Sequence, residues 1–115
     1  MTVERTVRVR GRGRVEVAAY GLADAEHLVE KELGRLWPEA RVWVTEVARA
    51  GGAARIVEEF TVSYGLEADV AVPAESPDEA PGAAFRHARS LVAGSRYART
   101  EWATARGPRP GGEGA

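Results

Sequence analysis

The chain has 115 residues, of which 44% are hydrophobic and 29% charged, and its formal net charge is −1. This length accommodates one domain of roughly 100–150 residues, and the composition is that of a chain able to bury a core. The absence of cysteine excludes disulfides, thiolate metal ligands and cysteine nucleophiles. No apolar run approaches the roughly 20 residues of a membrane helix, and no signal peptide is recognisable. We therefore expect a cytoplasmic protein that contacts no membrane.

The charges are unevenly distributed along the chain. Residues 1–20 hold five arginines against two acids, residues 21–84 hold 13 acids against five bases, and residues 85–109 hold six arginines against one acid. A basic surface can form only if folding gathers the two basic ends, away from the central carboxylates. Residues 107–115 are rich in glycine and proline, so we expect a disordered tail behind a single domain of residues 1–106.

The first predicted element is a strand near the amino terminus. Valine alternates with charged residues over residues 7–10 and again over residues 14–17, which is the period-two pattern of a half-buried strand. Gly11-Arg12-Gly13 interrupts this pattern, as a bulge, a bend or a tight turn would. The sequence leaves open whether this region is one kinked strand or a short hairpin.

A helix is predicted over residues 22–36, where apolar residues recur at three- and four-residue intervals until Trp37-Pro38 ends the pattern. The same helix carries His27, Lys31 and Arg35 at four-residue steps, which places three basic groups in one stripe.

Residues 41–48 are rich in β-branched and aromatic residues and predict a strand. This strand contains Trp43, the best candidate for an exposed ring on which a base or a flavin could stack, although we favour core or interface packing for it. Two further strands are predicted over residues 56–64 and 66–72, with Gly65 between them, and the short loops imply an antiparallel meander.

A second helix is predicted from near residue 81 or 83 to about residue 102. Four arginines fall on one side of it without an acid among them: Arg86, Arg89, Arg96 and Arg99. Guanidinium groups suit bidentate phosphate contacts, and a solvated arginine face is the competing interpretation.

The predicted order is thus β-α-β-β-β-α, an α+β domain with a largely antiparallel four-stranded sheet and two helices packed on one face. The first helix then lies beside the last, which brings Lys31 and Arg35 toward the arginine side of the second helix. No GxSxG, HExxH, Walker loop or paired-histidine spacing occurs. We therefore expect no catalytic residues, no metal site, no cofactor and no enzymatic activity.

The pattern resembles the amino-terminal domain of ribosome hibernation-promoting factors over about residues 7–106. That family has the β-α-β-β-β-α order. Its helix-one form EKLxRL is similar to EKELGRL at residues 30–36, and its VxAxSED segment is similar to VAVPAESPDE at residues 70–79. Residues 96–107, RYARTEWATARG, resemble the aromatic, arginine-rich end of actinobacterial members.

The resemblance implies a non-catalytic RNA-binding protein that occupies the messenger- and transfer-RNA channel of the small ribosomal subunit and inhibits translation in resting or stressed cells. The family's RNA contacts come from basic helix residues, which carry over to Lys31, Arg35, Arg86, Arg89, Arg96 and Arg99.

Two alternatives remain open. A dodecin-like flavin-binding oligomer has a similar order of strand, helix, tryptophan-bearing strand, turn and strand, with Trp43 as the stacking residue, but residues 75–106 would be unexplained. The other alternative is a protein-interaction domain whose sheet face makes a homodimer.

Overall fold

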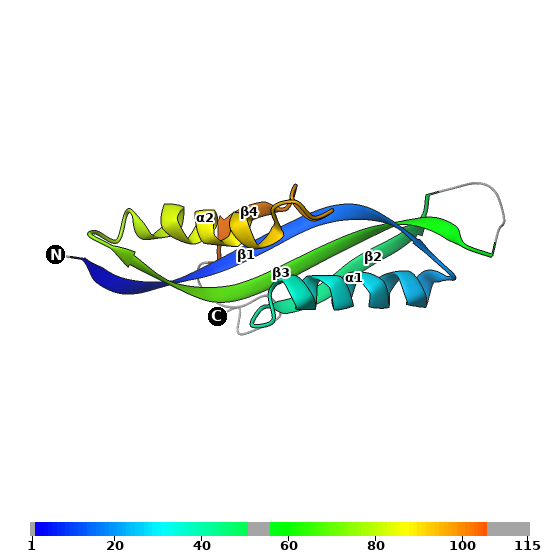
Figure 1. Ribbon diagram of the computed structural model, residues 1–115, viewed down its shortest axis with the longest axis horizontal. Coiled ribbons are helices and arrows are strands. Elements are labelled where there is room, and N and C mark those ends of the chain that lie inside the picture. Colours follow the sequence, from blue (N-terminus) through cyan, green and yellow to red (C-terminus); the bar gives the residue numbers. More distant parts are fainter. Residues whose placement is uncertain (1, 51–55, 106–115) are drawn as a thin grey trace, which may run out of the picture.

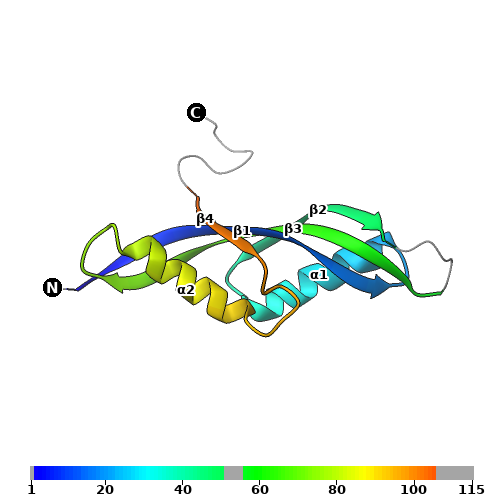
Figure 2. The ribbon, with the colours of Figure 1, turned by 90° about the horizontal axis from the view of Figure 1, so that it is seen from above.

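The computed structural model describes residues 2–50 and 56–105, which form a four-stranded antiparallel sheet and two helices (Figure 1). The elements are β1 (Val3–Ala19), α1 (Leu22–Leu36), β2 (Arg41–Arg49), β3 (Glu58–Ala74), α2 (Ala80–Val92) and β4 (Glu101–Thr104). The strands lie in the order β2-β3-β1-β4, and both helices cover the same face of the sheet (Figure 2). This is the connectivity of the ferredoxin-like, split β-α-β arrangement. The predicted α+β class and its two-layer architecture are confirmed.

The order of the elements differs from the prediction, because it is β-α-β-β-α-β and not β-α-β-β-β-α. Residues 58–74 form one continuous strand, so Gly65 does not separate two strands. Residues 101–104, which were predicted to end the second helix, form the fourth strand instead. The helix stops earlier because Ala93 is extended and Gly94 follows with a positive φ of 78°, and the N–H of Ser95 closes this turn on the carbonyl of Val92 at 3.1 Å. The predicted tail over residues 107–115 lies outside the described residues.

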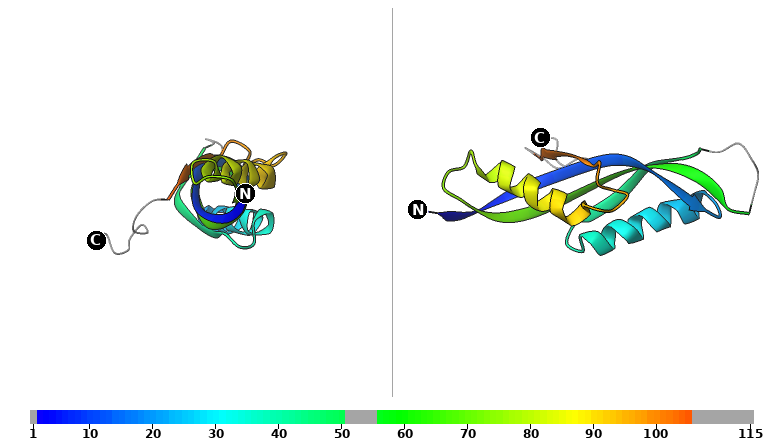
Figure 3. Two further views of the ribbon diagram at one scale, coloured as in Figure 1. Left: turned by 90° about the vertical axis from the view of Figure 1, so that its left-hand side faces the viewer. Right: turned by 45° about the horizontal axis from the view of Figure 1, so that its top comes forward.

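The two 17-residue strands β1 and β3 form the frame of the molecule. They pair antiparallel without a break, from Val3 opposite Ala74 to Ala19 opposite Glu58. The amino-terminal region is therefore one strand and neither a hairpin nor a bulged strand. A strand of this length extends roughly 57 Å at about 3.4 Å per residue, and the protein is accordingly elongated, with extents of 59 × 36 × 19 Å (Figure 3).

Gly11 is needed in β1 for a close approach and not for a turn. A Cβ atom built there would lie 2.5 Å from Cζ3 of Trp102 and 2.7 Å from Cγ2 of Thr100. The indole of Trp102, on the neighbouring strand β4, thus packs against bare backbone. The glycine that interrupts the valine alternation is what allows β4 to dock.

The core lies between the sheet and the two helices. Each helix contributes a stripe of small or branched side chains at four-residue spacing, namely Ala25, Val29 and Leu33 from α1 and Ala84, Ala88 and Val92 from α2. Trp37, at the end of α1, is 4% exposed and its ring centroid lies 6.0 Å from that of His87 and 6.1 Å from that of Trp102. It joins the two helices to β4.

The two helices point their carboxyl ends toward each other over the middle of the sheet (Figures 1 and 2). The segment between α2 and β4 closes this junction. Tyr97, which is 1% exposed, donates a hydrogen bond of 2.6 Å to Oε1 of Glu32 on α1. The hydroxyls of Tyr64 and Thr100 lie 2.7 Å apart, and Thr100 donates to the carbonyl of Tyr97. This buried network fixes the path of the chain into β4.

The four arginines predicted on one side of the second helix do not share that helix. Pro81 lies in the first turn of α2, where its missing N–H is not required, but the helix ends at Val92. Arg86 and Arg89 are therefore on α2, whereas Arg96 and Arg99 lie in the segment that leads to β4.

We predict that Gly11→Ala lowers the free energy of unfolding by roughly 1–3 kcal/mol, because the added methyl group forces Trp102 and Thr100 to move. Gly34→Ala is the matched control. Nothing lies within 4 Å of a Cβ atom at Gly34, which is inside α1, so this change should stabilise the protein by about 1 kcal/mol. Urea denaturation measures the free energy of unfolding of both variants. Equal stability of the wild type and the Gly11 variant would contradict the role of Gly11 in the packing of Trp102.

A second prediction concerns alkaline pH. Burial raises the pKa of Tyr97, the hydrogen bond to Glu32 raises it further, and burial also raises the pKa of Tyr64. An unfolded tyrosine loses its proton near pH 10, so above that pH the unfolded chain releases protons that the folded protein retains. The free energy of unfolding therefore falls, by up to about 1.4 kcal/mol per pH unit for each such tyrosine.

Tyr97→Phe should make this decline shallower, because one of the two groups is then absent. Urea denaturation between about pH 8 and about pH 11 provides the measurement. If the free energy of unfolding falls equally steeply with pH in Tyr97→Phe and in the wild type, the raised pKa of Tyr97 is not its cause.

Candidate functional site: the helix-free face of the sheet

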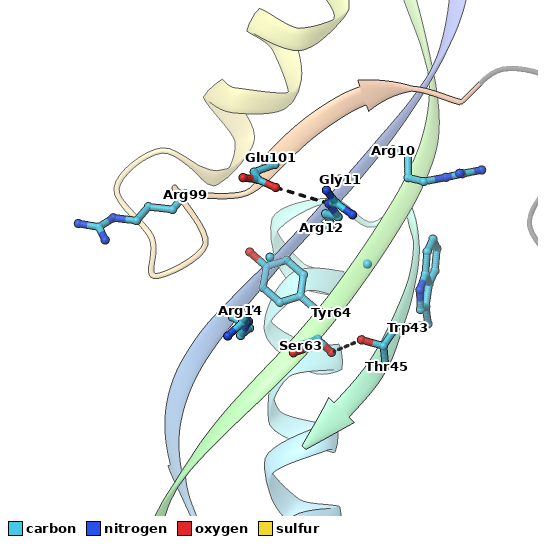
Figure 4. A pocket seen from close by; sticks show the side chains of 12 residues that line it. Arg10, Gly11, Arg12, Arg14, Trp43, Thr45, Ser63, Tyr64, Arg99 and Glu101 are labelled. Carbon is cyan, nitrogen blue, oxygen red and sulfur yellow. Dashed lines mark hydrogen bonds and ion pairs between the residues drawn. The ribbon is translucent and has the colours of Figure 1, made fainter. Parts of the chain in front are cut away.

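An open groove of about 790 Å³ lies over the face of the sheet that carries no helix (Figure 4). It is lined by Arg10, Gly11, Arg12, Gly13, Arg14, Trp43, Thr45, Ser63, Tyr64, Gly65, Arg99 and Glu101. In Figure 4, Trp43 stands on the β2 side of this groove, and Glu101 lies on the β4 side. The volume is within the range of about 300–1,000 Å³ that is usual for ligand sites.

The pairing of β1 with β3 determines which arginines on this face remain free of acids. Side chains alternate along a strand, and Val9 and Val15 are buried beneath the helices, so the even-numbered arginines of β1 face the groove side. Across β3 they pair in register as Arg8 with Asp69, Arg10 with Glu67, Arg12 with Gly65 and Arg14 with Ser63. Acids therefore oppose the first two arginines and uncharged residues oppose the last two.

The first two arginines form ion pairs that hold the sheet. Nε of Arg8 lies 2.9 Å from Oδ1 of Asp69, a hydrogen bond that raises the pKa of the guanidinium. Nη2 of Arg10 lies 2.9 Å from Oε2 of Glu67, whose side chain is only 6% exposed. Removing Arg10 would leave this buried carboxylate without its partner, which is costly. We assign both arginines to the structure of the sheet.

The last two arginines are held weakly or not at all. Nε of Arg12 lies 3.5 Å from Oε1 of Glu101, but both side chains are exposed, by 82% and 76%. Such a pair contributes little to stability and exchanges readily with other partners. Within residues 2–50 and 56–105, no carboxylate makes an ion pair with Arg14 or Arg99. Arg99 lines the groove from the segment before β4, although its side chain extends away from the sheet in Figure 4.

Trp43 forms an aromatic surface on the other side of the groove. It lies opposite Gly65, and a Cβ atom at that glycine would be 2.6 Å from both Cε2 and Cζ2 of the indole. The ring therefore rests on the backbone of β3, and the guanidinium carbon of Arg41 lies 5.4 Å from its centroid. Trp43 is half-buried on the sheet face and does not belong to the core, so of the two packings that the sequence favoured, core packing is wrong and interface packing stays a prediction.

Trp43, Gly65, Arg12 and Glu101 form one transverse row, because each is the register partner of the next. An aromatic ring that covers the backbone of Gly65 and an exposed cation on the next strand thus follow one another across the sheet, at strand spacings of about 4.8 Å. The arrangement can hold a planar group on the ring and an anionic group at the arginines.

The six basic residues predicted to bind RNA do not form one surface. Lys31 and Arg35 are exposed on α1, and Arg86 and Arg89 are exposed on α2. Arg96 lies 3.3 Å from Oε1 of Glu32 and also donates to the carbonyl of Glu16, while Arg99 reaches the groove on the opposite side of the sheet.

Folding gathers the two basic ends only in part, because Arg12, Arg14 and Arg99 line one groove whereas other arginines of these ends are neutralised. Arg8, Arg10 and Arg96 all pair with carboxylates of the acidic central region. Whether any of the six predicted residues contacts RNA stays a prediction.

Arg12, Arg14 and Ser63 were not identified as site residues from the sequence. The alternation of arginine with valine placed Arg12 and Arg14 on one strand, but their opposition to Gly65 and Ser63 depends on a pairing between residues 49 to 53 positions apart. Knowing that register was necessary to separate them from Arg8 and Arg10.

The described part of the chain contains no group of three metal-ligating side chains, and neither of its helices is long and apolar enough to cross a bilayer. Comparison with known proteins found no matching family model, no matching curated protein and no matching solved structure. The dodecin-like alternative leaves α2 and β4 unexplained, and these elements cover and complete the sheet.

Proposed function

We propose that this protein is a non-catalytic binder of single-stranded nucleic acid, and that the ligand lies on the helix-free face of the sheet. The observation that carries the proposal is the row in which the ring of Trp43, resting on Gly65, lies across β3 from the exposed Arg12. Beside Arg12 stands Arg14, which has no ion pair with any described residue. Proteins that bind single strands combine aromatic side chains, on which bases stack, with cations that follow the phosphates.

The geometry favours a single strand over a duplex. The groove is open and shallow, its aromatic ring can reach only a base that is not already stacked within a helix, and the two helices of the fold cover the opposite face. The net charge of −1 gives little long-range attraction, so we expect binding to depend on the local arginines and to weaken as salt rises.

The resemblance to hibernation-promoting factors implies that the partner is the RNA of the small ribosomal subunit. We therefore keep in the proposal that the protein acts in the cytoplasm and inhibits translation. The observed order of elements is not that of the family, so this partner rests on the short motifs alone. Because of the groove, we expect the RNA to contact the sheet and not the helices.

We predict that the wild-type protein binds a single-stranded oligonucleotide and that Trp43→Ala weakens binding roughly fivefold to 150-fold, the value of one stacked base. Trp43→Phe should retain part of the affinity because it keeps an aromatic face. Fluorescence anisotropy of a labelled oligonucleotide provides the measurement. Unaltered affinity in Trp43→Ala would contradict the stacking role.

The arginines are tested by two matched double variants, Arg12→Glu with Arg14→Glu on the sheet and Arg86→Glu with Arg89→Glu on α2. The sheet variant should abolish binding, whereas the α2 variant, with the same change in net charge, should retain it. A milder pair, Arg12→Gln with Arg14→Gln, should reduce the slope of log affinity against log salt by about 1.4, at about 0.7 per phosphate contact. Loss of binding in the α2 variant alone would place the site on the helices instead.

Sedimentation of the same variants with small ribosomal subunits at low salt tests the partner. We expect the wild type and the α2 variant to travel with the subunits and the sheet variant to stay at the top of the gradient. Oligonucleotide binding without any sedimentation would leave the nucleic-acid site in place and remove the ribosome as its partner.

A further inference from the structure

Two hydroxyl groups lie in the groove between the aromatic ring and the arginines. Thr45 and Ser63 both line it, and Figure 4 shows Ser63 between Thr45 on the β2 side and Arg14 on the β1 side. Ser63 is the register partner of Arg14, and Gly65, under the ring of Trp43, is two residues further along β3. On the surface of the sheet, Ser63 therefore lies on the diagonal line that joins the ring of Trp43 to Arg14.

The two hydroxyls differ in what they can offer a ligand. Oγ1 of Thr45 donates its proton to the carbonyl of Ser63 at 3.2 Å, so it can only accept from a ligand. Oγ of Ser63 makes no hydrogen bond within the described residues, and the side chain is half-buried. It can therefore both donate and accept.

The order of groups in a nucleotide matches this diagonal. The sugar connects the base to the phosphate, so a base on Trp43 and a phosphate at Arg14 place the sugar over Ser63, because the ring of Trp43 already covers Gly65. Gly65 contributes no side chain, which leaves Ser63 as the polar side chain of β3 beneath the sugar. A ribose presents a 2′-hydroxyl that both donates and accepts, and this group distinguishes RNA from DNA.

We propose that Ser63 binds the ribose 2′-hydroxyl and that the groove thereby selects RNA over DNA. This inference rests on the proposed function, because it requires a base on Trp43 and a phosphate at the arginines. Ser63 then determines the choice of sugar, whereas Trp43, Arg12 and Arg14 supply affinity for either sugar.

The test compares oligouridylate with oligodeoxyuridylate of the same length, which differ only in the sugar. The wild type should bind the RNA roughly fivefold more tightly, the equivalent of one hydrogen bond between neutral groups. Ser63→Ala should lose this preference by weakening RNA binding while its affinity for the DNA stays unchanged. Ser63→Thr keeps the hydroxyl and should restore the preference.

Thr61→Ala is the matched control, since Thr61 lies two residues along the same strand, on the same face, outside the groove. It should keep the wild-type preference. Equal affinity of the wild type for both oligonucleotides, or an unchanged preference in Ser63→Ala, would overturn the inference and leave the proposed function standing. Absence of binding to either oligonucleotide would overturn both.

Discussion

The antiparallel register of β1 and β3 is the constraint on which the rest of the structure depends. A slip of one residue would exchange the buried and exposed faces of both strands. A slip of two residues would preserve those faces but could place Glu67 opposite Arg12, and the cation of the groove would then be neutralised. Within this pair Tyr64 packs on its register partner Gly13, where an added Cβ atom would lie 2.5 Å from the tyrosine hydroxyl oxygen. The contacts of Trp102 on Gly11 and of Trp43 on Gly65 hold β4 and β2 in register with the pair. The same contacts that hold the fold therefore define the site.

The meeting of the two helix carboxyl ends explains much of the basic character of the sequence. The negative ends of two helix dipoles converge over the middle of the sheet, and cations near them are stabilising. Arg35 and Arg89 lie in the last turns of α1 and α2, and Arg96 binds Glu32 at the junction. These arginines have a structural reason to be where they are. Arg12 and Arg14, in the middle of a strand, have no such reason, and this distinguishes them as candidates for a ligand.

The sequence was informative wherever the determinants were local. The helix over residues 22–36 and the strand that begins at Arg41 follow from spacing and residue type, and both are confirmed. The prediction that Gly65 separates two strands is wrong. Gly65 accommodates the ring of Trp43, and this role depends on the neighbouring strand β2. The early end of α2 has a local signal in Gly94, but the spacing of the arginines continues beyond it and favours a longer helix. The groove required a pairing between distant residues, which no single-sequence pattern displays.

The groove is positively charged before a ligand arrives, because four arginines line it against a single acid, and the attachment of β4 determines where that acid lies. The buried network of Tyr64, Thr100 and Tyr97 fixes the entry to β4, and Glu101 is thereby set opposite Arg12. Glu101 is the only acid among the groove residues in the described chain. Its pair with Arg12 is exposed and weak, so a phosphate can replace the carboxylate at small cost. The remaining arginines of the groove attract a polyanion, and in the proposed function stacking on Trp43 is the further contact that retains a single strand.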